Sequence, residues 1–137
     1  MTKSELLHEL NANTFVVLRP SLIEGVGVFA IRDIPNGCRD MFGKPEPDDT
    51  WISISKNEVE LLSSHAQFLI GNYCLYDDEN YFVPEKGFKK IDVSLCLNHS
   101  DTPNIISIND GDYFEAIREI KMGEELLIDY GQIVDHE

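Results

Sequence analysis

The sequence contains no apolar run long enough to cross a membrane. A spanning helix needs about 20 consecutive apolar residues, and no stretch of the 137 residues approaches that length. The first residues, Met1 to His8, also lack the long apolar segment of a secretory signal. We therefore expect a protein without a membrane partner, and a cytoplasmic one if the host is a prokaryote.

Basic residues are also scarce, with 11 Lys and Arg against 25 Asp and Glu and a formal net charge of −14. A protein that follows a phosphate backbone needs clustered Lys and Arg, and the sequence has no such cluster. We therefore expect no direct binding to nucleic acid. An acidic surface attracts basic partners and speeds their encounter, although the same charge also serves solubility alone.

Cysteine is represented only by Cys38, Cys74 and Cys96, an odd number with no C-x-x-C pair. This pattern is typical of reduced thiols and gives neither a disulfide framework nor a thiolate zinc site. Cys74 and Cys96 have apolar neighbours, so we interpret both as small buried hydrophobic residues. We expect no metal site.

Familiar catalytic motifs are missing as well: there is no G-x-S-x-G elbow, no P-loop and no H-E-x-x-H. A nucleophile and a base could be assembled from Cys96 and His99, but two residues this close on one short segment rarely reach the required geometry. Glu124 and Glu125 follow a turn glycine, where we expect solvated side chains rather than acid–base catalysis.

What is present is a series of short β-branched and aromatic runs separated by turn residues. Hydrophobic residues make up 42% of the chain, which is ordinary for a globular protein. The length suits one domain with one core, so we predict a mainly β single domain over residues 1–137. The predicted strands are Phe15–Leu18 (ending before Pro20), Val28–Ile31, Trp51–Ile54, Tyr81–Val83, Ile105–Ile108, Tyr113–Ile117 and Leu126–Ile128.

Two helices are predicted. Thr2-x-x-Glu5 has the form of a capping box and opens a short helix within residues 1–14, with Leu6, Leu7 and Leu10 on one apolar face. A second capping box, Ser55-x-x-Glu58, begins a longer helix that Gly71 is placed to end. Its predicted stripe consists of Val59, Leu62, Ala66, Leu69 and Tyr73. A loop over residues 43–50, a turn at 109–112 and a short tail at 132–137 complete the prediction.

Two further segments are, by themselves, most simply connections. The polar stretch from Leu97 to Asn104 has the Asn, Ser, Asp and Pro composition of a turn. Gly25-Val26-Gly27 is typical of a β-bulge. It is not the dinucleotide fingerprint, because the third glycine is missing and no helical pattern follows.

Three segments in order nevertheless resemble the signature of the SET-domain lysine methyltransferases. They are Ser21–Ala30 around Gly25-Val26-Gly27, Asn98-His99-Ser100 with Pro103-Asn104, and Gly123–Leu126 with Asp129-Tyr130-Gly131. The resemblance covers about residues 15–131. It implies the SET-domain β-clip fold, with short strands, one or two short helices and a threaded, pseudoknot-like C-terminal segment.

The resemblance also implies a site for S-adenosylmethionine. In the family the glycine motif lets the backbone approach the methionine part of this cofactor, which here implicates Gly25, Val26, Gly27 and Val28. The equivalents of Asn98 and His99 bind the cofactor, Asn98 at its methionyl end and His99 through its backbone near the adenine. Tyr130 corresponds to the tyrosine that lines the methyl-transfer site.

The sequence departs from the family pattern in several places. No Cys follows Cys96, so the cysteine-rich segment that often closes the site is not seen. We expect the tail, a second subunit in a homodimer, or the substrate to supply that wall. Ile128 stands where many members carry Phe or Tyr, and this position is associated with the number of methyl groups added. Asp101 replaces a common Cys, and Leu95-Cys96-Leu97 lacks the usual Arg. Tyr73 or Tyr76 is the candidate for a second tyrosine in the lysine channel.

These observations predict an enzyme that transfers a methyl group from S-adenosylmethionine to a lysine side chain of a basic protein or peptide. The alternative is a catalytically silent SET-like module that binds a basic partner. A methyltransferase for another acceptor is a third interpretation.

Overall fold

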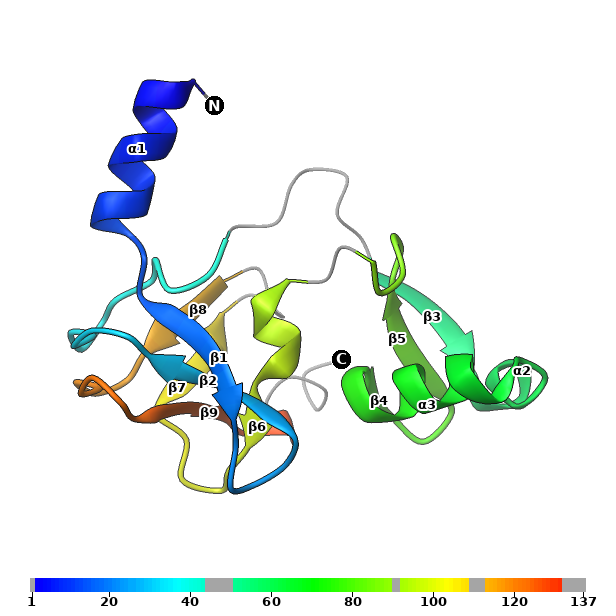
Figure 1. Cartoon of the computed structure of the whole chain (residues 1–137). Coiled ribbons are helices and arrows are strands. Elements are labelled where there is room, and N and C mark those ends of the chain that lie inside the picture. Colours follow the sequence, from blue (N-terminus) through cyan, green and yellow to red (C-terminus); the bar gives the residue numbers. More distant parts are fainter. Residues whose placement is uncertain (1, 44–50, 90–91, 109–112, 132–137) are drawn as a thin grey trace.

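The structure, a computed structural model, describes residues 2–43, 51–89, 92–108 and 113–131. Within these residues short strands predominate, as predicted (Figure 1). The predicted loop over 44–50, the turn at 109–112 and the tail at 132–137 lie outside the described residues. No helix in the described part of the chain is both long and apolar enough to traverse a bilayer.

A four-stranded sheet forms the centre of the fold. Its strands are β1 (Val16–Pro20), β2 (Val26–Ala30), β9 (Glu125–Ile128) and β6 (Asn98–His99), in the order β1-β2-β9-β6. The last strand therefore lies between two strands that precede it, antiparallel to β2 and parallel to β6. This insertion is the threaded C-terminal segment that the resemblance implied.

The two faces of this sheet differ in chemistry, because successive side chains of a strand point to opposite faces. Val28, Ala30, Leu126 and Ile128 share one face and are at most 1% exposed. They pack in the main core, and burying each larger aliphatic side chain contributes about 1.5–3 kcal/mol. The opposite face carries Gly27, Phe29, Glu125 and Leu127, with Asn98 paired beside Leu127.

A two-stranded hairpin of β7 (Ile105–Ile108) and β8 (Tyr113–Ala116) completes the main core. Ile105 and Ala116 face each other in the pairing and are both fully buried. The isolated bridge between Ile34 and Ile120 places two more buried isoleucines in the same cluster. The two strands predicted at Ile105–Ile108 and Tyr113–Ile117 are thus confirmed, and they pair antiparallel.

A second unit has its own small core. It consists of the sheet β3 (Trp51–Ser55), β5 (Asn80–Pro84) and β4 (Leu75–Tyr76), in the order β3-β5-β4, with helices α2 (Lys56–Glu60) and α3 (Ser64–Tyr73). Its core residues are Val59, Ile70, Cys74 and Val83. Figure 1 shows this unit beside the main sheet, in green. The described residues thus form two hydrophobic clusters where the sequence suggested one core.

The long helix predicted from Ser55 is wrong in one respect: it is two helices. Ser55 and Glu58 form the complete capping box of α2, as predicted. Ser63 then acts as a second N-cap, accepting from the N–H of Ala66, so the chain restarts as α3. Gly71 lies inside α3 rather than ending it, and Ile70 rather than Leu69 is the buried residue.

Three boundaries of other elements also differ. Pro20 is part of β1, where an edge strand tolerates the missing N–H of proline. Asn98 and His99 are not in a turn but form strand β6, and the bends follow at Asp101, Thr102 and Asn104. The apolar residues before them, Val93–Cys96, form a short 3₁₀ helix, η1.

The opening helix α1 (Lys3–Ala12) begins at the Thr2 N-cap, as predicted, and buries none of its residues. Leu6, Leu7 and Leu10 remain 46%, 58% and 55% exposed. In Figure 1 the helix projects away from the main sheet. Its predicted apolar face is therefore present but is not covered by the described chain.

Candidate functional site

Asn98 is the buried polar residue of β6, 8% exposed. Its Nδ2 group donates to the carbonyl oxygen of Glu24, at 3.1 Å, and to Oε2 of Glu125, at 2.8 Å. Both amide hydrogens are therefore engaged, and Oδ1 is the remaining hydrogen-bonding group of the side chain. An amide held in this way presents an acceptor to a ligand, not a donor.

Glu125 is the residue that joins the first and last motifs. Its carboxylate accepts from Ser21 Oγ at 2.9 Å and 3.0 Å, and from Asn98. The pairing of Glu125 with Phe29 puts its side chain on the same face as Gly27, its diagonal neighbour. The carboxylate thus lies over β2. From the sequence we expected it to extend into solvent, and that expectation is wrong.

Gly27 makes room for this arrangement. A Cβ at this position would overlap the Glu125 carboxylate and approach Ser21. Gly25 has a different requirement, because its φ of 44° is in the left-handed region that favours glycine. Gly25 therefore allows the left-handed backbone of the turn, and Gly27 allows a side chain to approach the backbone closely. The side chain that approaches Gly27 is that of Glu125.

Asn104 holds β9 in place from the hairpin side. It is 2% exposed, its Nδ2 donates to the carbonyl of Glu125 at 2.8 Å, and its Oδ1 accepts from the N–H of Leu127 at 2.8 Å. Its backbone N–H donates to the Leu127 carbonyl at 3.1 Å. A buried amide with these partners holds β9 in a fixed position against the segment that contains Asn104.

His99 and Tyr130 meet at the end of the two parallel strands. The backbone N–H of Tyr130 donates to Nδ1 of His99 at 3.1 Å, and the two rings lie 5.2 Å apart. Nε2 of His99 lies 3.0 Å from Oδ1 of Asp101. The imidazole therefore has a positioning contact in addition to the backbone role that the resemblance implied.

The Tyr130 hydroxyl donates to the carbonyl of Leu97 at 2.5 Å. Burial and the negative charges of Glu24 and Glu125, with a contribution from Cys96, raise the pKa of this phenol. The side chain is still partly accessible, since Tyr130 is 39% exposed. Tyr130 is thus a neutral, oriented phenol beside acidic groups.

The remaining sequence candidates lie in different places. Val26 is 45% exposed at the start of β2, whereas Val28 is fully buried in the main core. Ile128 is 1% exposed in the same core. Tyr73 ends α3 and Tyr76 lies in β4, so both belong to the second unit, where Tyr76 contacts Tyr81 with ring centroids 5.6 Å apart. The structure thus brings together Gly27, Asn98, His99 and Tyr130, whereas Tyr73 and Tyr76 lie in the second unit.

Neither a metal centre nor a thiol nucleophile emerges. Within the described ranges, no group of His, Cys, Asp and Glu is arranged to hold a metal ion. The three cysteines are free. Burial raises the pKa of Cys74 to about 11 and also raises that of Cys96, so neither thiol is activated. His99 Nδ1 already accepts from Tyr130, which leaves the hypothetical Cys96–His99 pair without a free base on that side.

Sequence reasoning missed two members of this cluster, Glu125 and Ser21. Both are polar residues at motif edges, where the solvated interpretation is the usual one. The signal that could have identified Glu125 is its place in the last motif together with the alternation of β9, since its neighbours Leu126 and Ile128 belong to the opposite, apolar face. No local signal distinguishes Ser21 from an ordinary turn serine.

Comparison with known proteins places this geometry in context. The family model of the SET domain matches residues 25–131 of this chain, from Gly25 of the glycine motif to Gly131 after Tyr130. No significant match exists among curated proteins.

Solved structures give the same answer for the fold. A candidate histone methyltransferase of Plasmodium falciparum is 21% identical, with a TM-score of 0.51 over 86% of this chain and 94% of that one. Polycomb Repressive Complex 2 of Chaetomium thermophilum bound to GSK126 is 27% identical, with a TM-score of 0.56 over 94% of this chain. The apo, autoinhibited ctPRC2 gives the same identity and TM-score. The chain spans 18% of the matched chain in each of these two complexes.

Proposed function

The chain belongs to the SET-domain family, and on that basis we propose that it transfers a methyl group from S-adenosylmethionine to a lysine side chain of a basic protein or peptide. The observation that carries the proposal is the convergence of three separated motifs. Gly27, Asn98 and Glu125 meet on one face of the sheet, and Tyr130 is bonded to residues on both sides of Asn98.

The chemistry of these groups fits the proposed cofactor. The α-ammonium of its methionyl end is a donor, and Asn98 Oδ1 is an acceptor whose own amide hydrogens are already used. The sulfonium is a cation, and the charges of Glu24 and Glu125 both act on the Tyr130 hydroxyl. When bound, S-adenosylmethionine supplies an electrophilic methyl group whose sulfur leaves as a neutral thioether.

The residues of the chain then have to orient an amine and keep it uncharged. A free lysine has a pKa near about 10.4, so desolvation must favour its neutral form before its lone pair can attack. The Tyr130 phenol, fixed by Leu97, provides an oxygen that can orient the amine without titrating itself at neutral pH. This role is one of alignment, which accounts for a large share of catalysis in transfer reactions.

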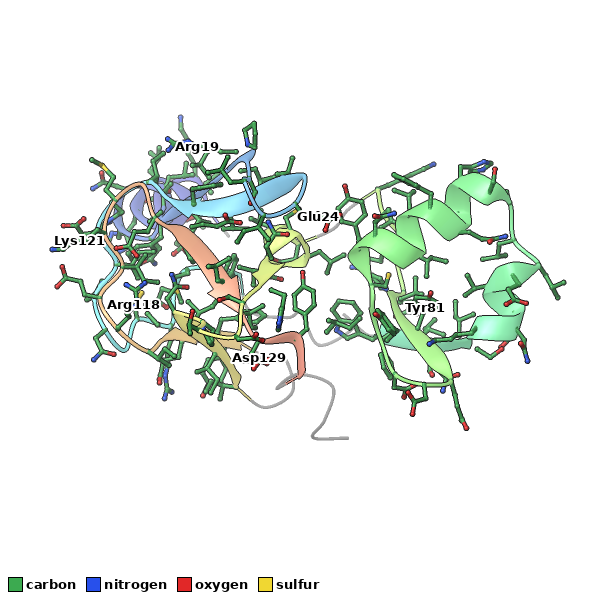
Figure 2. All side chains as sticks on the ribbon, turned by 90° about the horizontal axis from the view of Figure 1, so that it is seen from below. Arg19, Glu24, Tyr81, Arg118, Lys121 and Asp129 are labelled. Carbon is green, nitrogen blue, oxygen red and sulfur yellow. The ribbon has the colours of Figure 1, made fainter. Side chains whose placement is uncertain are left out.

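Charge supports a basic substrate. Figure 2 shows Glu24 and Asp129 on the side of the main sheet that faces the second unit, whereas Arg118 and Lys121 lie on the opposite side. A lysine within a basic segment would therefore meet acidic groups on approach. The net charge of −14 favours the same class of partner.

Calorimetry with S-adenosylmethionine tests the proposal, followed by mass spectrometry of basic proteins incubated with the enzyme and labelled cofactor. We expect saturable binding and label on lysine. A folded protein without saturable binding would contradict the proposal. Binding of a basic partner that is indifferent to the cofactor would instead support the silent-module alternative, and light scattering of the same sample tests for the homodimer.

A further inference from the structure

Glu125 is a half-buried carboxylate without a basic partner among the residues that the structure describes. Three other glutamates of the described chain do have such partners. These pairs are Glu115 with Arg39, Glu124 with Arg118, and Glu119 with Lys121. Within the described ranges, the Glu125 carboxylate is met by the neutral donors Ser21 and Asn98. Partial burial of a carboxylate is costly unless hydrogen bonds or a cation offset the lost hydration, and here the described chain supplies neutral hydrogen-bond donors and no cation.

The carboxylate decides which way the Asn98 amide points. Turning the amide over would bring Oδ1 against two acceptors, the Glu24 carbonyl and the Glu125 carboxylate, and would break both hydrogen bonds. Charge-assisted hydrogen bonds are roughly twice as strong as neutral ones, so the Glu125 contact is the stronger of the two that hold this orientation. Glu125 therefore acts through Asn98 and exposes Oδ1 to whatever binds there.

The negative charge of Glu125 also acts on the Tyr130 hydroxyl. Glu125 and Glu24 each make the phenol harder to ionise, so a negative potential acts at the Tyr130 hydroxyl. Glu125 has no described cation beside it that would cancel this potential. A positive charge placed near Tyr130 is consequently favoured over an uncharged group of the same shape.

We propose that Glu125 is a positioning residue with a second effect: it orients Asn98, and its unpaired charge makes the site prefer cationic S-adenosylmethionine over the S-adenosylhomocysteine product. This rests on the proposed function. In the transfer, the amine lone pair forms the new N–C bond while the C–S electron pair stays on sulfur. The positive charge thus moves to the substrate nitrogen, and the spent cofactor loses the attraction that held its sulfonium.

The two ligands share their ammonium, carboxylate and adenosine, and differ at sulfur, so their affinity ratio isolates this effect. Calorimetry is performed with both ligands on the wild type, Glu125→Gln and Glu124→Gln. We expect Glu125→Gln to weaken S-adenosylmethionine binding by about tenfold or more and S-adenosylhomocysteine binding by clearly less. Glu124→Gln makes the same change in net charge at the adjacent residue, whose carboxylate bonds Arg118, and should leave the ratio unchanged.

An unchanged ratio in Glu125→Gln would overturn the proposal, because a purely structural glutamate would weaken both ligands alike. Thermal unfolding establishes that each variant is folded. If Glu125→Gln does not fold, Glu125→Asp replaces it: the retained charge should preserve the wild-type ratio while the shorter side chain weakens both ligands. A reduced ratio in Glu125→Asp would contradict the charge effect. Wild-type protein that binds neither ligand would contradict the proposed function itself.

Discussion

The backbone N–H of Tyr130 donates a hydrogen bond to Nδ1 of His99, at 3.1 Å. An imidazole nitrogen accepts a hydrogen bond only when it carries no proton, so neutral His99 has its proton on Nε2, beside Asp101. His99 thereby fixes the backbone of Tyr130, which stands two residues after the end of β9. The imidazole thus holds the backbone of Tyr130, the tyrosine of the proposed methyl-transfer site, in place.

His99→Leu should remove this hydrogen bond. The variant leaves the Tyr130 N–H without its acceptor, at a cost of about 1 kcal/mol in stability, and should lower turnover more than cofactor affinity. His99→Asn is the matched control, since its Oδ1 reaches the place of Nδ1 and can still accept. Amide hydrogen exchange at Tyr130 should be faster in His99→Leu than in the wild type, and near the wild-type rate in His99→Asn. Equal exchange in all three proteins would show that the hydrogen bond does not hold in solution.

Tyr130→Phe removes the hydroxyl that donates to Leu97. Because that oxygen is proposed to orient the amine and not to hold the cofactor, we expect turnover to fall by about a hundredfold or more. The affinity for S-adenosylmethionine should stay within about threefold of the wild type, since no cofactor contact is lost. Steady-state methyl transfer and calorimetry separate the two quantities. An equal loss in both would place the hydroxyl in cofactor binding instead.

Gly27→Ala tests whether the Glu125 carboxylate needs the space that the missing Cβ of Gly27 leaves. The added Cβ displaces Glu125 and breaks its contacts with Asn98 and Ser21. We expect a loss of about 1–3 kcal/mol in the free energy of unfolding and weaker binding of S-adenosylmethionine. Gly71→Ala is the control, because it lies inside α3 with open space around its Cβ position. There, alanine should stabilise by about 0.5–1 kcal/mol. Denaturant unfolding measures both, and a neutral Gly27→Ala would argue against the packing described.

The buried thiol of Cys74 should lower the free energy of unfolding at alkaline pH. Burial raises the pKa of its thiol from 9.0 to about 11. A raised folded-state pKa means that the stability contribution is complete below pH 9.0 and is lost as the pH rises through about 11, where the unfolded thiol has already ionised. The full loss is roughly 2–3 kcal/mol. Cys74→Val should flatten the decline of unfolding free energy over this range, and the wild-type thiol should resist alkylation near neutral pH until the protein unfolds.

Much of the fold could be predicted because its strands satisfy local rules. The β-branched runs at Ile105–Ile108 and Leu126–Ile128 carry their alternation and turn residues with them. The split of the long helix was not foreseen, although Ser63 is a good N-cap. The apolar spacing continues across Ser63, and a periodic pattern does not show where hydrogen bonding is interrupted.

The site was less predictable because long-range pairing creates it. Asn98 and Tyr130 could be placed together only by their resemblance to a family, since no local rule joins β6 to β9. Glu125 was interpreted as solvated because local composition cannot reveal that Gly27, far away in sequence, leaves a space for its carboxylate. The dependence of such contacts on tertiary structure is the general limit of reading one sequence.

The position of β9 between β2 and β6 has a consequence for the order of assembly. During synthesis β1 and β2 can pair as a hairpin, but the edge of β2 that receives β9 stays open, and β6 has no partner. Such edges invite pairing with other chains. The central sheet closes only after Glu125–Ile128 has been synthesised, through contacts distant in sequence, which slows folding. A nascent chain of this protein is therefore most vulnerable to aggregation just before β9 emerges, and it acquires a complete site only after β9 is in place.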